Sequence, residues 1–310
     1  MKILITGAAG YLGRVLYSIL DTQNHVVMGI DSYLYDQEPV EGIFKADITS
    51  LKDMYNFTKG VDVVVALAGI VGDPACGLDE ATTRIVNLES TKLLIEACEV
   101  NKVKNLIFAS SCSVYGASDK IITEKSRTKP LSLYAETKLA SEKILLRRRR
   151  FTRPTILRFG TLFGYSPRMR FDLVANIMTA MAVKEGKVVI NGGDQWRPMV
   201  HVKDVAKTIE LMISDQPTYY YSKDRIWNVV GENYRIKDIA AMVAAITGAE
   251  LVEKTDVIDK RNYKVASSLP HEFTLEDGVK EIIDRFRTGT FADYKDNKYY
   301  NVKILQNLST

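Results

Sequence analysis

The chain has 310 residues, of which 46% are hydrophobic and 26% are charged, so it can form one large globular unit or two smaller ones. Its formal net charge of +4 does not suit a dedicated nucleic-acid-binding protein, and no run of about 18 uncharged apolar residues predicts a membrane span. The first apolar run passes directly into a glycine motif without a cleavage site, so no signal peptide is expected.

The predicted elements of the first half alternate between strands and helices, up to about residue 160. The predicted strands cover residues 2–6, 25–30, 61–66, 105–109 and 155–159. The predicted helices cover residues 11–22, 51–59, 81–101 and 133–149. This alternation predicts an α/β fold with a doubly wound parallel sheet, the Rossmann fold, whose ligands bind at the carboxyl ends of the strands.

The second half has a looser pattern. Helices are predicted at 171–184, 205–214 and 236–247, and strands at 188–190 and 226–230. We interpret residues 1–164 as a dinucleotide-binding domain, to which the chain returns at about 196–230. Residues 165–310 are then a smaller α/β C-terminal lobe that binds the substrate.

The three cysteines and one basic run suggest no further chemistry. Cys76, Cys98 and Cys112 have neither an even number nor the spacing of metal ligands, so no disulfide framework and no metal site is expected, and a cytoplasmic location fits. The four arginines at 147–150 favour a solvated helix end over a polyanion-binding surface, because cations complement the helix dipole there.

A glycine-rich turn follows the first predicted strand and opens the first helix. Glycines at this spacing allow a tight turn and a close approach of the backbone to a pyrophosphate, which the helix N-terminus attracts. The predicted cofactor contacts in this turn are Gly7, Gly10, Tyr11, Leu12 and Gly13. Asp31 ends the second predicted strand, where an acid binds the adenosine ribose and repels a 2′-phosphate. No Lys or Arg occurs in 32–38, so the sequence predicts NAD over NADP.

Tyr134 and Lys138 lie four residues apart on a predicted helix, so their side chains share one face. A phenol is too weak an acid to be a base at neutral pH, and we expect the lysine ammonium and the nicotinamide charge to lower its pKa. Ser111, at the end of the fourth predicted strand, would orient the reacting alcohol, with Ser113 and Ser110 as alternatives. The predicted catalytic set is therefore Ser111, Tyr134 and Lys138.

The order of these motifs resembles that of the extended short-chain dehydrogenases, which include the nucleotide-sugar epimerases and dehydratases. The resemblance rests on a GxxGxxG turn, an acid after the second strand, a serine-rich strand end with VYG, and YxxxK. It implies a nucleotide-sugar substrate, no nucleic-acid partner, and a homodimer packed through helices around 91–100 and 134–146. It also implies that Lys138 holds the nicotinamide ribose, and it adds cofactor-site residues: Asp47, Ile48, Leu67, Ala68, Gly69 and Asn87.

The same resemblance implies a substrate site in the second lobe. Arg197 and Arg261 match arginines that contact the nucleotide diphosphate, and Arg168 and Arg170 are further candidates for anion binding. Three further substrate-site positions depart from relatives in the family: Cys112, Ser113 and Thr161. Cys112 and Ser113 stand where the dehydratases carry an Asp-Glu pair, so 4,6-dehydration is not expected.

The leading hypothesis is an epimerase, similar to the UDP-glucose 4-epimerases, that oxidises and reduces C4 of a nucleotide sugar through a keto-sugar. One alternative is an oxidase that acts on C4 of a GDP-heptose-like sugar without epimerisation. A second alternative, of another class, is an NAD-binding scaffold without catalysis. The sequence leaves the nucleotide, the sugar and the fate of the keto-sugar open.

Overall fold

A central sheet organises the protein, whose computed structural model describes residues 1–21, 25–35, 38–147, 150–214, 225–254 and 261–308. The sheet has seven parallel strands in the order β11-β7-β5-β4-β1-β2-β3. They are β1 (Lys2–Thr6), β2 (Val26–Asp31), β3 (Ile43–Lys45), β4 (Val63–Ala66), β5 (Asn105–Ser111), β7 (Arg153–Phe159) and β11 (Ile226–Val229). This order confirms the predicted doubly wound fold.

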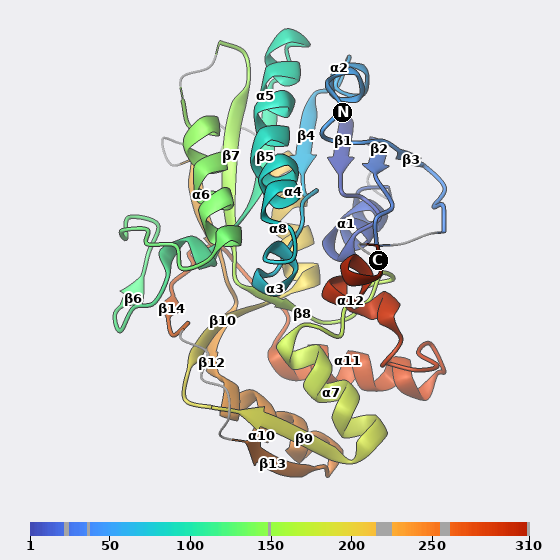
Figure 1. The fold of residues 1–310 in the computed structure, drawn as a ribbon, viewed down its shortest axis with the longest axis vertical. Coiled ribbons are helices and arrows are strands. Elements are labelled where there is room, and N and C mark those ends of the chain that lie inside the picture. Colours follow the sequence, from blue (N-terminus) through green and yellow to red (C-terminus); the bar gives the residue numbers. More distant parts are fainter. Residues whose placement is uncertain (22–24, 36–37, 148–149, 215–224, 255–260, 309–310) are drawn as a thin grey trace.

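Helices cover both faces of this sheet (Figure 1). One layer contains α1 (Tyr11–Asp21) and α8 (Val202–Ser214), and the other contains α2 (Leu51–Phe57), α5 (Ser90–Val100) and α6 (Leu133–Leu145). Alternate residues of β1 enter the two cores: Ile3 and Ile5 pack with the first layer, and Leu4 packs with the second. Because both faces are buried, the strands read as continuous apolar runs.

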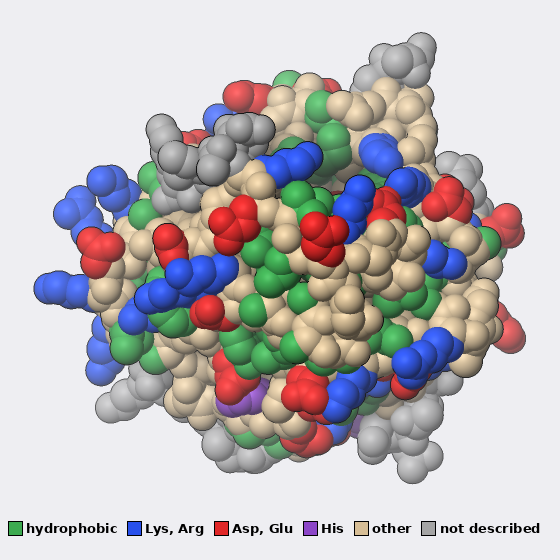
Figure 2. Space-filling model, turned by 90° about the horizontal axis from the view of Figure 1, so that it is seen from below, with side chains coloured by type: hydrophobic (Ala, Val, Ile, Leu, Met, Phe, Trp, Pro, Cys, Tyr) green, Lys and Arg blue, Asp and Glu red, His purple; other side chains and the backbone are tan. Residues whose placement is uncertain are grey.

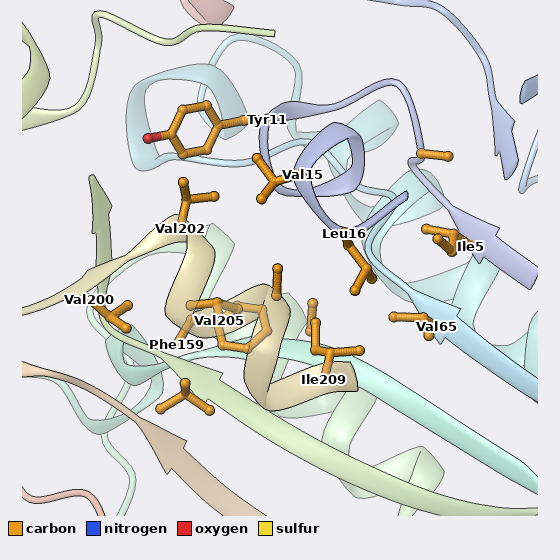
Figure 3. Packing of buried hydrophobic residues seen from close by; sticks show 14 of the residues in the cluster. Ile5, Tyr11, Val15, Leu16, Val65, Phe159, Val200, Val202, Val205 and Ile209 are labelled. Carbon is orange, nitrogen blue, oxygen red and sulfur yellow. The ribbon is translucent and has the colours of Figure 1, made fainter. Parts of the chain in front are cut away.

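The contact between α1 and α8 ties the second half of the chain to the first. Val15 and Leu16 of α1 face Val205 and Ile209 of α8 across a buried layer (Figure 3). Each such side chain contributes about 1.5–3 kcal/mol when it is buried. Within the return segment predicted at about 196–230, α8 and β11 thus join the dinucleotide-binding half, whereas β10 (Trp196–His201) lies in the second lobe.

The second lobe is built on small sheets and three helices (Figure 1). One sheet has the order β12-β10-β8, with β8 at Thr161–Phe163 and β12 at Glu232–Arg235. A separate core lies between the remaining elements: α7 (Val174–Glu185), α10 (Ile236–Thr247), α11 (Leu275–Arg287), β9 (Lys187–Asn191) and β13 (Glu250–Lys254). The lower face of this lobe carries acidic and basic side chains intermixed (Figure 2).

Short elements connect the two halves. They are α3 (Asp73–Cys76), α4 (Glu80–Arg84), β6 (Ile121–Ile122), β14 (Lys264–Val265) and α12 (Asn301–Leu308). The helix predicted at 81–101 consists of α4, a π-helical turn at Ile85–Glu89, and α5. The helix predicted at 133–149 ends at Leu145, and residues 148–149 lie outside the described residues. No described helix combines the length and apolar character that crossing a membrane requires.

Candidate active site

A cavity of about 1120 Å³ opens at the carboxyl edge of the main sheet. Four strand ends contribute Asp31, Leu67, Ser111 and Phe159, and the second lobe closes it with residues that include Tyr263. Such an edge, where the strand order reverses, is the usual ligand site of doubly wound folds. The predicted cofactor and catalytic residues therefore meet in one place, with the exception of Asn87.

The glycine turn forms a cradle at the N-terminus of α1. A Cβ atom on Gly13 would lie 2.1 Å from the carbonyl oxygen of Gly7, and one on Gly7 would lie 2.7 Å from the amide nitrogen of Ala68. Gly7 also has a φ of 73°, in the left-handed region that favours glycine. The missing side chains let the backbone reach the cavity, so the cradle fits a dinucleotide pyrophosphate.

The acids after β2 and β3 line the cavity next to this turn. The Asp31 carboxylate accepts hydrogen bonds from the backbone amides of Ala9 at 3.0 Å and Tyr33 at 2.9 Å. Asp47 accepts from the amide of Thr49 at 2.8 Å, and Ile48 follows it in the cavity wall. Leu67, Ala68 and Gly69, after β4, line the same wall. The carboxylates of Asp31 and Asp47, beside the apolar wall, fit the adenosine end of NAD.

Asn87 supports the cavity without lining it. It lies in the π-helical turn, is 4% exposed and does not line the cavity. Its side-chain oxygen accepts from the Ile70 amide at 2.8 Å, and its side-chain nitrogen donates to the Ile70 carbonyl at 2.9 Å. It therefore fixes the loop after β4 that carries Gly69, and its predicted contact with the cofactor stays a prediction.

The three predicted catalytic residues line one wall of the cavity. Ser132 caps α6 by accepting from the amide of Ala135, which sets the first turn that carries Tyr134. One turn later Lys138 is buried, and its ammonium donates to the carbonyl of Ala109 at 2.8 Å. Ser111 ends β5 and lines the cavity together with Tyr134, and its hydroxyl acts to lower the pKa of the Tyr134 phenol. The set thus joins a strand end to a helix face.

Burial has the largest effect on the pKa values of Tyr134 and Lys138. It raises the pKa of the Tyr134 phenol, while the hydrogen bond with Ser111 and the nearby Arg170 act in the opposite direction. Burial lowers the pKa of Lys138 to about 8. On balance the chain's own groups raise the pKa of the phenol, and the lowering expected from Lys138 is not among the causes in this structure.

The predicted substrate residues fall into two groups. Ser113, Thr161, Arg168, Arg170 and Arg261 line the cavity, whereas Cys112 and Arg197 do not. The Cys112 thiol is fully buried and donates to the carbonyl of Arg158 at 3.3 Å. The Arg197 guanidinium donates to the backbone carbonyl of Arg261. In this structure both side chains lie behind the lining of the cavity, and their contacts with the substrate stay predictions.

The arginines that line the cavity are held by carboxylates and amides. Arg170 makes two hydrogen bonds with Asp172, at 2.8 and 3.0 Å, and Arg168 donates to Asn301 at 2.9 Å. Arg261 donates to Asp73 at 2.9 Å. Fixed guanidinium groups that line the cavity are suited to the two negative charges of a nucleotide diphosphate.

A buried network behind the catalytic helix was not predicted. Glu142 and Arg158 form a two-pronged ion pair, with hydrogen bonds of 2.9 and 2.6 Å and side chains that are 1% and 4% exposed. Glu142 also accepts from Ser110, and Arg158 donates to the Tyr115 hydroxyl at 2.8 Å. One feature of the sequence indicates this network: Glu142 follows Lys138 by four residues and therefore lies on the same face of α6.

The cradle, the acid after β2 and the Ser-Tyr-Lys set define an oxidoreductase of the short-chain dehydrogenase type. Residues 3–229 match the model of the NAD dependent epimerase/dehydratase family, and the chain belongs to that family.

Named relatives and solved structures agree with this assignment. The chain is 30% identical over 236 residues to the "uncharacterized UDP-glucose epimerase YtcB" of Bacillus subtilis (strain 168), which covers 69% of this chain and 72% of that protein. MoeE5 in complex with UDP-glucuronic acid and NAD superposes with a TM-score of 0.81 at 26% identity, over 93% of this chain and 100% of that one. The UDP-glucuronic acid 4-epimerase from Bacillus cereus, in complex with UDP-glucuronic acid and NAD, superposes with a TM-score of 0.79 at 25% identity, over 93% and 99%.

Proposed function

We propose that the protein is an NAD-dependent epimerase that inverts C4 of a nucleotide-linked sugar. The observation that carries the proposal is that Ser111, Tyr134 and Lys138 line the same cavity as the glycine cradle. This arrangement sets an alcohol-binding pair beside the place for a nicotinamide ring. The names of the relatives, a UDP-glucose epimerase and a UDP-glucuronic acid 4-epimerase, support a UDP-sugar as the first substrate to test.

The chain's own groups would bind, orient and deprotonate the sugar. Tyr134 takes the proton of the C4 hydroxyl, and Ser111 holds that hydroxyl by a hydrogen bond. Lys138, fixed by the carbonyl of Ala109, lies within the same wall and binds the nicotinamide ribose. NAD, when bound, supplies the redox chemistry at C4. The keto-sugar then turns within the cavity and is reduced on its other face.

The anionic half of the substrate would lie against the second lobe. Arg168, Arg170 and Arg261 line the cavity and offer planar donors to the diphosphate oxygens. Cys112 is buried and Ser113 carries a hydroxyl, so neither position offers the acid and base that elimination of water requires. The wall therefore favours oxidation and reduction over dehydration.

Incubation with a panel of UDP-, GDP-, dTDP- and CDP-sugars tests this function. We expect one member to be converted to its 4-epimer, without net accumulation of NADH. Accumulation of NADH together with a free keto-sugar would favour the oxidase instead. NAD binding without any turnover of the panel would favour the scaffold.

Replacement of Asp31 by alanine tests the choice of cofactor. Loss of a charge-assisted hydrogen bond costs about 1.5–3 kcal/mol, so we expect NAD to bind roughly 10- to 100-fold more weakly. NADP should bind more tightly than it does to the parent chain, because the repulsion of the 2′-phosphate is removed. Titration of both cofactors by fluorescence measures the change.

Asp62→Ala is the matched control, because Asp62 lies just before β4 at the opposite edge of the sheet and binds the amide of Lys2. An Asp31→Ala variant that keeps the NAD and NADP affinities of the parent would contradict this role of Asp31.

We further propose a homodimer that packs through α5 and α6, which lie side by side on one face of the sheet (Figure 1). A cytoplasmic location and the domain boundary at 164 remain predictions. The buried, unpaired state of all three cysteines agrees with a reducing compartment.

A further inference from the structure

The C-terminal helix α12 forms part of the cavity, although it lies far beyond the family match, which ends at residue 229. Asn301, Leu305 and Leu308 line the cavity together with Tyr134. In Figure 1, α12 lies below α1 and beside α3, with which it is in contact. A helix from the end of the chain thus closes a site whose cofactor-binding motifs all lie in the first half.

A polar anchor holds the start of α12 to the second lobe. Asn301 is 2% exposed, accepts from the Arg168 guanidinium at 2.9 Å, and donates its backbone amide to Asp172 at 3.2 Å. Asp172 also holds Arg170, and Arg168 stacks over the ring of Tyr35, which lines the cavity after β2. The start of α12 therefore lies at the side of the cavity that is formed by the β2 loop.

Apolar contacts, which we call the seal, hold the same part of α12 to α3 and to the loop after β4. Val302 and Leu305 pack on the small cluster of Ile70, Ala75 and Cys76, against which Tyr134 also packs. Ala75 and Cys76 belong to α3 and Ile70 to the loop after β4, and of these Ile70 and Ala75 line the cavity. The first turn of α12 is therefore tied both to the residues after β2 and to α3, and the helix forms part of the cavity wall.

We propose that α12 is a cofactor-retaining element, which holds NAD in the cavity throughout turnover. This inference rests on the proposed function for the identity of the ligand and for the need to retain it. An epimerase must return its electrons to the same sugar, so the reduced cofactor has to stay until the keto-sugar has turned. A helix in the cavity wall, anchored on Arg168 and sealed on α3, slows the escape of the dinucleotide.

The rate of NAD release tests this role in the full-length protein. The double variant Val302→Ala, Leu305→Ala weakens the apolar seal, and Asn301→Ala removes the side-chain half of the polar anchor, the bond with Arg168, while leaving the seal in place. We expect each to release pre-bound NADH at least tenfold faster than the parent, as measured by the loss of cofactor fluorescence after dilution into excess NAD. Gln306→Ala, at an exposed position of the same helix, is the matched control and should release NADH at the parent rate.

Release rates within twofold of the parent in both test variants would overturn the proposal. Thermal melting without cofactor checks that each variant is folded, and the anchor variant keeps the test open if the seal variant is not. A parent chain that binds no NADH would instead sink the proposed function, so the two failures are distinguishable.

Discussion

Replacement of Tyr134 by phenylalanine is expected to lower turnover by about 10²- to 10⁴-fold, the usual contribution of a positioned acid–base group. The substitution removes one oxygen and keeps the ring that packs beside α3. Because the cradle and Asp31 are untouched, NAD should still bind with nearly the affinity of the parent. Steady-state rates with the active nucleotide sugar, together with a fluorescence titration of NADH, measure both quantities.

Tyr300→Phe is the matched control for this experiment, because the Tyr300 side chain does not line the cavity. It should leave the rate unchanged. If the Tyr134→Phe enzyme kept the full turnover of the parent, Tyr134 could not be the acid–base group, and the proposed epimerase mechanism would be wrong.

Replacement of Glu142 by alanine is expected to reduce the free energy of unfolding by about 3–5 kcal/mol. The Arg158 guanidinium would remain buried without its carboxylate, and an uncompensated buried charge has this typical cost. Ser110, on the strand that carries Ser111, would also lose its acceptor. Urea unfolding followed by circular dichroism measures the change.

The control for this variant is Glu136→Ala, on the same helix but half-exposed and at 4.0 Å from Arg84. Exposed pairs contribute about 0–1 kcal/mol, so this variant should unfold close to the parent. Equal losses of stability in the two variants would show that the buried pair has no special role.

The motifs that lie in one segment were predictable from the sequence. The glycine turn, Asp31, and the pair of Tyr134 and Lys138 each follow a strand or occupy one helix face, so spacing alone brings them to one edge. Six of the seven strands of the main sheet were predicted, all but β3, because buried parallel strands read as apolar runs in any chain. β11 is one of these six, although its place beside β7 depends on a contact across the whole second lobe.

The remaining features depend on pairing between distant segments. β13 pairs with β9 and α12 packs on α3, and neither contact leaves a periodic pattern in the local sequence. The local sequence also does not show in which direction a side chain at a strand end points. Cys112 directly follows Ser111, yet Cys112 lies in a buried cluster whereas Ser111 lines the cavity. For Arg197, the lobe geometry decides that it reaches the backbone of Arg261 and not the cavity.

The packing of α8 on α1 has a consequence for synthesis on the ribosome. When β7 has emerged, the apolar face of α1 still lacks the helix that covers it, and the edge of β7 lacks β11. At about 5–20 residues per second, the chain up to the end of β11 follows roughly 4–14 seconds later. The nascent first half is thus exposed to aggregation and to chaperone binding during that interval, and its native packing is completed only after most of the polypeptide has been translated.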